Sequence, residues 1–364
     1  MIAPFIHEYR ASRVVFGPGR RRDLAAEAGQ LGLRRLLVVT TPEQSHLGRE
    51  ISQVLEDACV GHFDGAAMHV PVEVARRAAN AARDLGADGC LAAGGGSAIG
   101  LAKAIALETG LPIMAVPTTY AGSEMTPLYG LTDHGQKRTG RDWNVMPRTV
   151  VYDPELTTSL PAGLTIASGL NAIAHAAEGL YAEDASPIHK LAAEEGIRAL
   201  AASLPGLLST PHDIGLRGSA QYGAWLCGSV LGQVKMGLHH KACHVLGGSF
   251  NLPHAETHAV VLPHALAYNG VCAPEAMAAL SRALGGGPPL DALDEFYGRV
   301  DAPRSLSAIG MPEHGLDHAA DLICTAPYPN PRPFIRSEIR AMLQAAFEGA
   351  TRPCASSSPH GSRR

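Results

Sequence analysis

The chain has 364 residues, which is too many for one ordinary hydrophobic core, so its length predicts two domains. Apolar residues make up 46% of it and the formal net charge is −4, a balance that excludes a basic surface for nucleic acid. No run of about 18 apolar residues predicts a membrane span. The first residues, MIAPFIHEYRASRVVFGPG, lack the pattern of a signal peptide, so we expect a cytoplasmic protein without a membrane partner.

The first half of the chain alternates short apolar runs with helical patterns. This alternation predicts a parallel β-sheet whose strands are joined by right-handed helical crossovers. The predicted strands lie at residues 36–39, 90–93, 113–116 and 150–152, and the predicted helices at 47–58, 72–85 and 98–108.

The pattern changes after Asp153-Pro154, where long Ala- and Leu-rich helical segments begin and no convincing strand follows. We therefore predict an α/β domain over residues 1–155 and an all-helical domain over residues 156–350. The remaining segment, 351–364, is polar and rich in Ser and Pro, and is expected to be a disordered tail.

A glycine-rich loop follows the predicted strand at 90–93. Gly94, Gly95, Gly96 and Ser97 stand between that strand and the next helix. Glycine lets a backbone approach a ligand closely, and a helix N-terminus offers free N–H groups that suit a phosphate. The context of strand, loop and helix therefore predicts a dinucleotide-binding site, although the loop is neither a GxGxxG motif nor a P-loop.

A second polar loop follows the strand at 113–116, and its Thr118, Thr119, Tyr120 and Ser123 are candidates for holding the pyrophosphate or ribose of the cofactor. Both loops are expected at the carboxyl edge of the sheet, where ligands bind in open α/β folds. Thr40 follows the strand at 36–39, where an acidic residue would repel the 2′-phosphate of NADPH. We therefore expect the protein to use NADH or NADPH.

Histidines recur at helical spacing in the second half. Asn171 and His175 stand four apart, as do His240 and His244, so each pair points the same way from a helix, and His254 follows. Three imidazoles and a carboxylate would favour iron or zinc. Asn171 contributes a neutral amide instead, which should lower the affinity for a dication. The histidines could still exchange protons near neutral pH.

Together, GGGS, PTT, the 171/175 pair and the histidines at 240, 244 and 254 resemble the iron-containing (group III) alcohol dehydrogenase family. The resemblance covers residues 10–350. It implies an N-terminal dinucleotide-binding domain, a helical catalytic domain of the dehydroquinate synthase-like fold, an active site between them, and a homodimer.

The chain departs from the metal-dependent members at two positions. Asn171 stands where they carry Asp, and Gly100 where they usually carry Asp. With the segments GLNAIAHAAEGLYA and NPRPF, these departures resemble a branch that reduces the C=C bond of maleylacetate to 3-oxoadipate during breakdown of aromatic compounds. That branch is regarded as needing no metal, so the resemblance implies a small dicarboxylate substrate and no metal ion.

The implied reaction adds hydride to the alkene carbon β to a ketone, and the resulting enolate must be stabilised and protonated. We expect His244 and His254 to supply the proton and stabilise the enolate. His175 and Asn171 are expected to orient them or the substrate, and His240 to line the site.

The two substrate carboxylates need cationic partners, for which Lys241 and Arg332 are the candidates. Tyr120, Ser123 and Thr126 are expected to add hydrogen bonds from the first domain. The other histidines of this region, His239, His258 and His264, are expected to be structural.

Three alternatives stay open. The first is a metal-dependent alcohol dehydrogenase for a small alcohol or aldehyde, because three histidines can hold zinc without a carboxylate. The second is a lyase of the dehydroquinate synthase type, which the amide at Asn171 disfavours. The third is a metal-binding protein without catalysis, which would have no use for a pair of cofactor loops.

Overall fold

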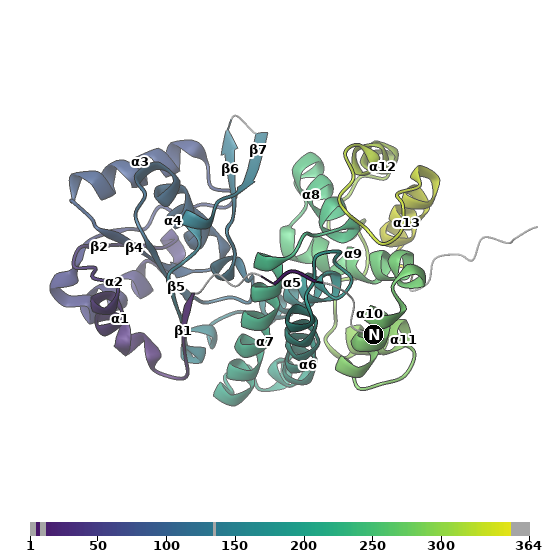
Figure 1. Ribbon diagram of the computed structural model, residues 1–364, viewed down its shortest axis with the longest axis horizontal. Coiled ribbons are helices and arrows are strands. Elements are labelled where there is room, and N and C mark those ends of the chain that lie inside the picture. Colours follow the sequence, from purple (N-terminus) through teal and green to yellow (C-terminus); the bar gives the residue numbers. More distant parts are fainter. Residues whose placement is uncertain (1–4, 8–11, 134–135, 351–364) are drawn as a thin grey trace, which may run out of the picture.

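The computed structural model describes residues 5–7, 12–133 and 136–350, which form an α/β half followed by a helical half (Figure 1). The predicted fold class is confirmed. All strands of the described residues lie before residue 153, and the helices from α5 onward follow them. The predicted tail at 351–364 lies outside the described residues. None of the described helices is long and apolar enough to cross a membrane.

Six strands form one parallel sheet in the order β1-β8-β5-β4-β2-β3. From β2 the chain first moves outward to β3, and it then crosses back to β4 and continues to β5 and β8 on the other side. The order therefore reverses between β2 and β4, and ligands of open α/β sheets bind at such a point, beyond the strands' carboxyl ends. The strands are β1 (Arg13–Phe16), β2 (Leu36–Val39), β3 (Cys59–Phe63), β4 (Gly89–Gly94), β5 (Ile113–Pro117) and β8 (Thr149–Tyr152).

Helices cover both faces of this sheet, which explains why β2 is apolar at every position. Side chains alternate between the two faces of a strand. Leu36 and Val38 pack in the core formed with α1 and α2, whereas Leu37 and Val39 pack in the core formed with α3 and α4. The four helices are α1 (Leu24–Gln30), α2 (Ser45–Leu55), α3 (Val72–Asp84) and α4 (Gly96–Thr109).

An antiparallel hairpin, β6 (Leu128–Asp133) and β7 (Gln136–Arg141), stands apart from the main sheet. It was not predicted, since its second strand reads QKRTGR and has no apolar alternation. The hairpin reaches the helical half, where Arg141 Nη2 donates to the carbonyl of Gly232 at 2.7 Å.

The helical half contains two hydrophobic cores that share helix α9. One core joins α9 to α5, α6, α7, α10 and α11, and the other joins it to α8, α12 and α13. These helices are α5 (Ala162–Gly179), α6 (Pro187–Ser209), α7 (Ile214–Gln233), α8 (Leu238–Phe250), α9 (His254–Asn269), α10 (Pro274–Ala283), α11 (Pro289–Arg299), α12 (Leu316–Cys324) and α13 (Arg336–Glu348). Short 3-10 helices lie at Arg20–Asp23, Pro42–Gln44, Glu56–Ala58, Ser123–Met125, Trp143–Val145, Pro154–Thr157, Gly270–Cys272 and Glu313–Gly315.

The α/β half meets the helical half through the loop after β5. Gly122 has a φ of +78°, which favours glycine, and it lies against Gly228 of α7. A Cβ at Gly228 would stand 2.9 Å from the Cα and 3.0 Å from the carbonyl oxygen of Gly122. Nearby, the Tyr120 hydroxyl accepts a hydrogen bond from the buried Arg217 of α7 at 3.3 Å. The predicted cofactor loop is therefore anchored on the helical half.

This contact predicts that Gly228→Ala destabilises the protein by about 1–3 kcal/mol, because the added methyl group meets backbone that cannot move cheaply. Gly163→Ala is the matched control: it is also helical, and a Cβ there would meet no atom within 4 Å. That control should leave stability unchanged or raise it by up to about 1 kcal/mol. Urea unfolding of the two variants checks this. Equal effects would show that the two halves do not meet at Gly228.

Candidate active site

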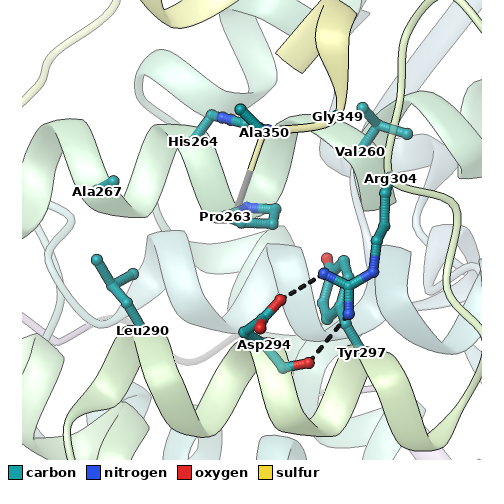
Figure 2. A pocket seen from close by; sticks show the side chains of 10 residues that line it. All are labelled: Val260, Pro263, His264, Ala267, Leu290, Asp294, Tyr297, Arg304, Gly349 and Ala350. Carbon is teal, nitrogen blue, oxygen red and sulfur yellow. Dashed lines mark hydrogen bonds and ion pairs between the residues drawn. The ribbon is translucent and has the colours of Figure 1, made fainter. Parts of the chain in front are cut away.

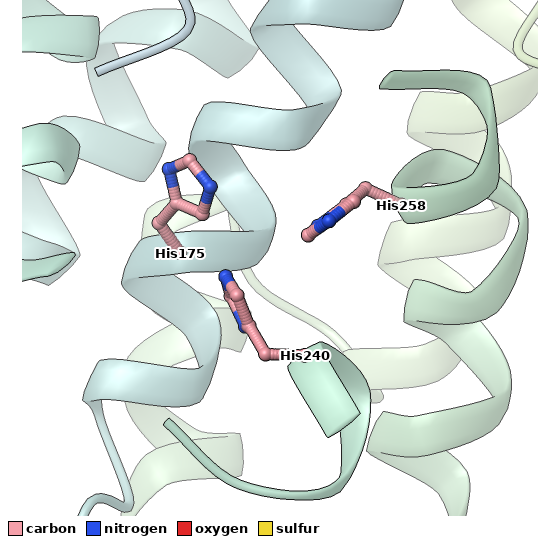
Figure 3. A group of neighbouring side chains, drawn as sticks. All are labelled: His175, His240 and His258. Carbon is pink, nitrogen blue, oxygen red and sulfur yellow. The ribbon is translucent and has the colours of Figure 1, made fainter. Parts of the chain in front are cut away.

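Three imidazoles from three helices converge in the interior of the helical half. His175 comes from α5, His240 from α8 and His258 from α9, and their side chains point toward one another (Figure 3). One ring nitrogen of each lies within 4.8 Å of the others, and all three side chains are buried. Neutral imidazole nitrogens at this spacing are a donor set for a transition-metal ion.

Burial keeps these imidazoles uncharged. Desolvation lowers the pKa of His175, His240 and His258 well below the ordinary value, and repulsion from neighbouring histidines lowers it further. At neutral pH all three rings are therefore neutral, and each presents a nitrogen lone pair. That is the protonation state that metal binding requires.

Several buried polar atoms of these three histidines, and of Asn171 one turn before His175 on α5, have no hydrogen-bond partner in the described residues. They are Asn171 Oδ1, His175 Nδ1, His240 Nε2 and both ring nitrogens of His258. An unsatisfied buried acceptor costs about 1–3 kcal/mol, so such atoms rarely gather without a ligand. A dication would take one lone pair from each of the three neutral imidazoles, so the residues present fit a metal ion.

A buried carboxylate holds one of the three rings. Glu178 Oε2 lies 2.5 Å from His240 Nδ1, and the Glu178 carboxylate also accepts the backbone N–H groups of His239 and His240. Sequence reasoning did not single out Glu178. Its spacing was a usable signal, because Asn171, His175 and Glu178 stand at i, i+4 and i+7 of α5 and so share one face.

His258 was expected to be structural, and the structure instead places it inside the cluster. The signal was present in the sequence, since His254 and His258 are four apart, like the pairs at 171/175 and 240/244. His239 is also buried there, and its Nε2 lies 2.9 Å from the His258 carbonyl.

His244 and His254, the predicted proton donors, lie at the exposed rim of the cluster. The His254 ring centroid is 4.4 Å from that of His258, and the His244 ring centroid is 6.1 Å from that of His240. His244 Nδ1 lies 3.2 Å from the Tyr328 hydroxyl. Exposed imidazoles next to buried ones can exchange protons with solvent, which a proton donor must do.

The predicted substrate cations have different surroundings. Lys241 is half-buried, and its ammonium lies 5.4 Å from the centre of the Tyr328 ring. Arg332 is already engaged: it pairs with Glu338 at 2.6 Å and donates to the Tyr268 carbonyl at 3.1 Å. The Arg332 charge is thus used within the protein, which leaves Lys241 as the candidate for a substrate carboxylate.

The loop after β5 is tied down by a lysine that sequence reasoning missed. Lys103 Nζ donates to the carbonyl and hydroxyl oxygens of Ser123 and Thr126 and to the Leu128 carbonyl, at 2.7 to 3.3 Å. Burial lowers the pKa of Lys103 to about 7. Ser123 and Thr126, expected to contact cofactor or substrate, therefore have hydroxyls bound to Lys103, and Tyr120 is fully buried on Arg217. These side chains shape the loop from within.

The glycine loop lies where β4 ends. Gly94 has a φ of +147°, and a Cβ there would meet the Gln44 side chain at 2.7 Å. A Cβ at Gly95 would meet Thr119 at 2.9 Å, so the two predicted cofactor loops pack against each other. By contrast, a Cβ at Gly96 would meet nothing within 4 Å, which leaves the start of α4 open to a ligand.

The side chains around that opening have distinct roles. Ser97 is half-buried in the first turn of α4. Thr118 is buried and accepts from Gln44 Nε2 at 2.9 Å, which links the segments after β2 and β5. Thr40 is fully buried, with its hydroxyl 2.8 Å from His62 Nε2, so it presents no charge at the end of β2.

A pocket elsewhere in the helical half does not belong to this site (Figure 2). It lies on a different face of α9, lined by Val260, Pro263, His264 and Ala267. Its one guanidinium, Arg304, is paired with Asp294. Burial lowers the pKa of His264 to about 4, so His264 is neutral there at physiological pH.

Comparison with known proteins identifies the family of this chain. Residues 11–154 match the model for "Iron-containing alcohol dehydrogenase", and residues 165–347 match that for the "Fe-containing alcohol dehydrogenase family, C-terminal". The chain therefore belongs to the iron-containing alcohol dehydrogenase family.

Individual relatives are also similar over nearly the whole length. A maleylacetate reductase from Burkholderia cepacia is 56% identical over 95% of this chain and 98% of its own. A solved protein from Ralstonia eutropha JMP134, provisionally described as an alcohol dehydrogenase, has a TM-score of 0.94 and 57% identity, with 96% of this chain and 100% of that one covered. A solved maleylacetate reductase from Agrobacterium tumefaciens has a TM-score of 0.93 and 49% identity, over 96% and 100% of the two chains.

The expectation that no metal is involved is wrong. The chain belongs to an iron-containing family, and three imidazoles are arranged as a possible metal site. The expectation gave too much weight to the missing charge at Asn171 and did not count His258. A neutral amide lowers the attraction for a dication, but three neutral imidazoles with unsatisfied lone pairs remain.

This site predicts that Asn171→Asp raises the affinity for Zn²⁺ by at least about tenfold, or ~1.4 kcal/mol, because it adds a negative charge beside the ion. Competition against a coloured chelator measures the change. Asn144→Asp, the same substitution at an exposed position, is the control and should have no effect. Unchanged affinity in Asn171→Asp would mean that residue 171 does not reach the ion.

Proposed function

We propose that this protein is a maleylacetate reductase, which reduces the C=C bond of maleylacetate to give 3-oxoadipate with NADH or NADPH. The relatives named above support the substrate, since maleylacetate reductases match nearly the whole chain at 49–56% identity. The observation that carries the proposal is the nearness of Gly122, in the predicted cofactor loop, to His175, whose Nδ1 would lie 3.6 Å from a Cβ added at Gly122. Hydride donor and substrate would meet there.

The substrate has a C=C bond conjugated to a ketone and a carboxylate at each end. Hydride from the nicotinamide adds to the alkene carbon β to the ketone, and the electron pair moves to the ketone oxygen. The chain holds the cofactor at the glycine loop and the substrate over the histidine cluster. Lys241 attracts one substrate carboxylate, and helices α5, α8 and α9 exclude water from the inner side of the cluster.

The enolate must then gain a proton on carbon. His254 and His244 stand at the exposed rim, where they can deliver that proton and recover it from solvent. Asn171, His175, His240 and His258 would hold the metal ion, which when bound supplies Lewis-acid stabilisation of negative charge on oxygen.

The family resemblance also supports a homodimer in the cytoplasm, and sedimentation velocity of the purified protein tests the assembly. An alcohol dehydrogenase acting on a small alcohol remains the second candidate, because the similar protein from Ralstonia eutropha JMP134 is provisionally described as one.

The function predicts that freshly prepared maleylacetate supports oxidation of NADH and NADPH, with kcat/KM values within about tenfold of each other (~1.4 kcal/mol), because Thr40 places no charge against a 2′-phosphate. Nicotinamide absorbance follows the reaction. Small primary alcohols with the oxidised cofactors serve as the comparison. Faster turnover of the alcohols than of maleylacetate would favour the second candidate.

The proton and binding roles predict different kinetic changes. His254→Ala should lower kcat by roughly 10²–10⁴, the range for loss of an acid–base group. Lys241→Ala should raise KM more than it lowers kcat, because a carboxylate contact exists before and during the reaction. His264→Ala, in the separate pocket, is the control and should retain kcat and KM. A His254→Ala variant changed only in KM would assign His254 to binding.

A further inference from the structure

Glu178 is buried between two helices and makes contacts that a simple helix cap does not need. Its carboxylate accepts the His239 backbone N–H at 2.8 Å and the His240 backbone N–H at 3.2 Å, which satisfies two donors at the start of α8. The same carboxylate also lies 2.5 Å from His240 Nδ1. One group therefore holds both the backbone of α8 and the side chain that α8 contributes to the cluster.

The contact with Nδ1 determines which nitrogen of His240 carries the proton. Both oxygens of the Glu178 carboxylate act as acceptors of backbone N–H groups, Oε1 toward His239 and Oε2 toward His240, so the oxygen that faces His240 Nδ1 is placed as an acceptor. His240 must then donate from Nδ1, so its Nε2 has no proton and keeps its lone pair. Nε2 is the atom that is buried without a partner beside His175 and His258.

We propose that Glu178 is a positioning residue that fixes His240 as the Nδ1–H tautomer and thereby directs the Nε2 lone pair into the His175–His240–His258 cluster. Carboxylates that orient metal-ligating histidines in this way strengthen metal binding in other proteins. The inference deepens the proposed function and rests on the metal site described above, but not on the identity of the substrate.

A glycine just before α8 leaves space for the Glu178 side chain to contact the start of that helix. A Cβ at Gly237 would stand 3.1 Å from Glu178 Oε1 and 2.9 Å from Asn330 Oδ1, so glycine there lets both side chains approach. Asn330 Oδ1 accepts the Leu238 N–H at 3.1 Å. The cap of α8 is thus shared between Asn330 and Glu178, and only Glu178 touches an imidazole.

The neighbouring histidine provides a comparison within the same turn. His239 Nε2 faces the carbonyl of His258 at 2.9 Å, so His239 donates from Nε2 and belongs to the opposite tautomer. Adjacent residues of α8 are therefore held in different tautomers, one by a carbonyl of α9 and the other by a carboxylate of α5.

The test begins with the unaltered protein without metal. Two-dimensional NMR that correlates imidazole nitrogens with ring protons reports the tautomer of each histidine, and His240→Gln identifies the His240 signals. We expect the Nδ1–H form for His240. Finding the Nε2–H form in the unaltered protein would overturn the proposal, whatever the variants do.

The variants test the consequence for metal. Glu178→Gln should shift the His240 nitrogen signals and weaken Co²⁺ binding by about 10–100-fold in competition with a chelator. The matched control is Glu27→Gln, which removes a buried carboxylate of α1 that pairs with Arg13 of β1. It should leave the His240 nitrogen signals and the Co²⁺ affinity unchanged.

Asn330→Ala separates positioning from capping, because it removes a cap of α8 without touching an imidazole. It should lower stability while the His240 nitrogen signals remain in place. If Glu178→Gln leaves Co²⁺ affinity unchanged, or lowers it only as much as Asn330→Ala with unaltered His240 signals, Glu178 is only a cap and the proposal fails. Neither readout involves maleylacetate, so failure of the proposed function would be seen separately.

Discussion

The site depends on the burial of helix α5. Every residue from Thr165 to Gly179 is buried, so any polar group on this helix must find a partner in the interior. Asn171, His175 and Glu178 share one face of α5, and α8 and α9 bring imidazoles to that face. Desolvation then keeps the rings neutral. The same burial thus creates the need for a ligand and prepares the nitrogens that can bind it.

The proposed hydride transfer sets a second requirement, because the nicotinamide and the substrate would have to meet although their proposed sites lie on different parts of the chain. Two glycines allow the two halves to approach closely at this point. Gly122 of the loop after β5 lies against Gly228 of α7 and beside His175. Lys103 fixes the same loop through hydrogen bonds that its Nζ donates to Ser123, Thr126 and Leu128. The loop is therefore fixed by hydrogen bonds from the buried Lys103 side chain, and glycines let it approach the helical half.

Sequence reasoning was strongest where burial leaves a simple pattern. The runs LLVV and IMAV are apolar throughout because helices cover both faces of the sheet, and they correspond to β2 and β5. It failed for β3, which is half-buried and reads CVGHF, and for the polar strand β7. Pairing partners stabilise such strands, and no local pattern reveals those partners.

Within the site, the four-residue spacing identified Asn171, His175 and His240 as candidates. Spacing alone does not show which side chains are buried. His254 and His258 are one turn apart, and only the packing of α9 shows that His258 is buried while His254 is exposed. Glu178 and Lys103 were missed for a related reason. A charged residue in a helix is ordinarily solvated, and these two are buried because of contacts made far away in the sequence.

The place of β1 in the sheet has a consequence for how the protein is made. β1 is the first strand to be synthesised, yet among the described strands it pairs only with β8, in register from Arg13 and Thr149 to Phe16 and Tyr152. During translation β1 cannot pair within the sheet until β8 has left the ribosome. Until then the apolar edge of β5 is also uncovered, since β8 is its outer neighbour. A nascent chain stalled before residue 149 would expose an unpaired parallel strand, which is the kind of edge that invites aggregation.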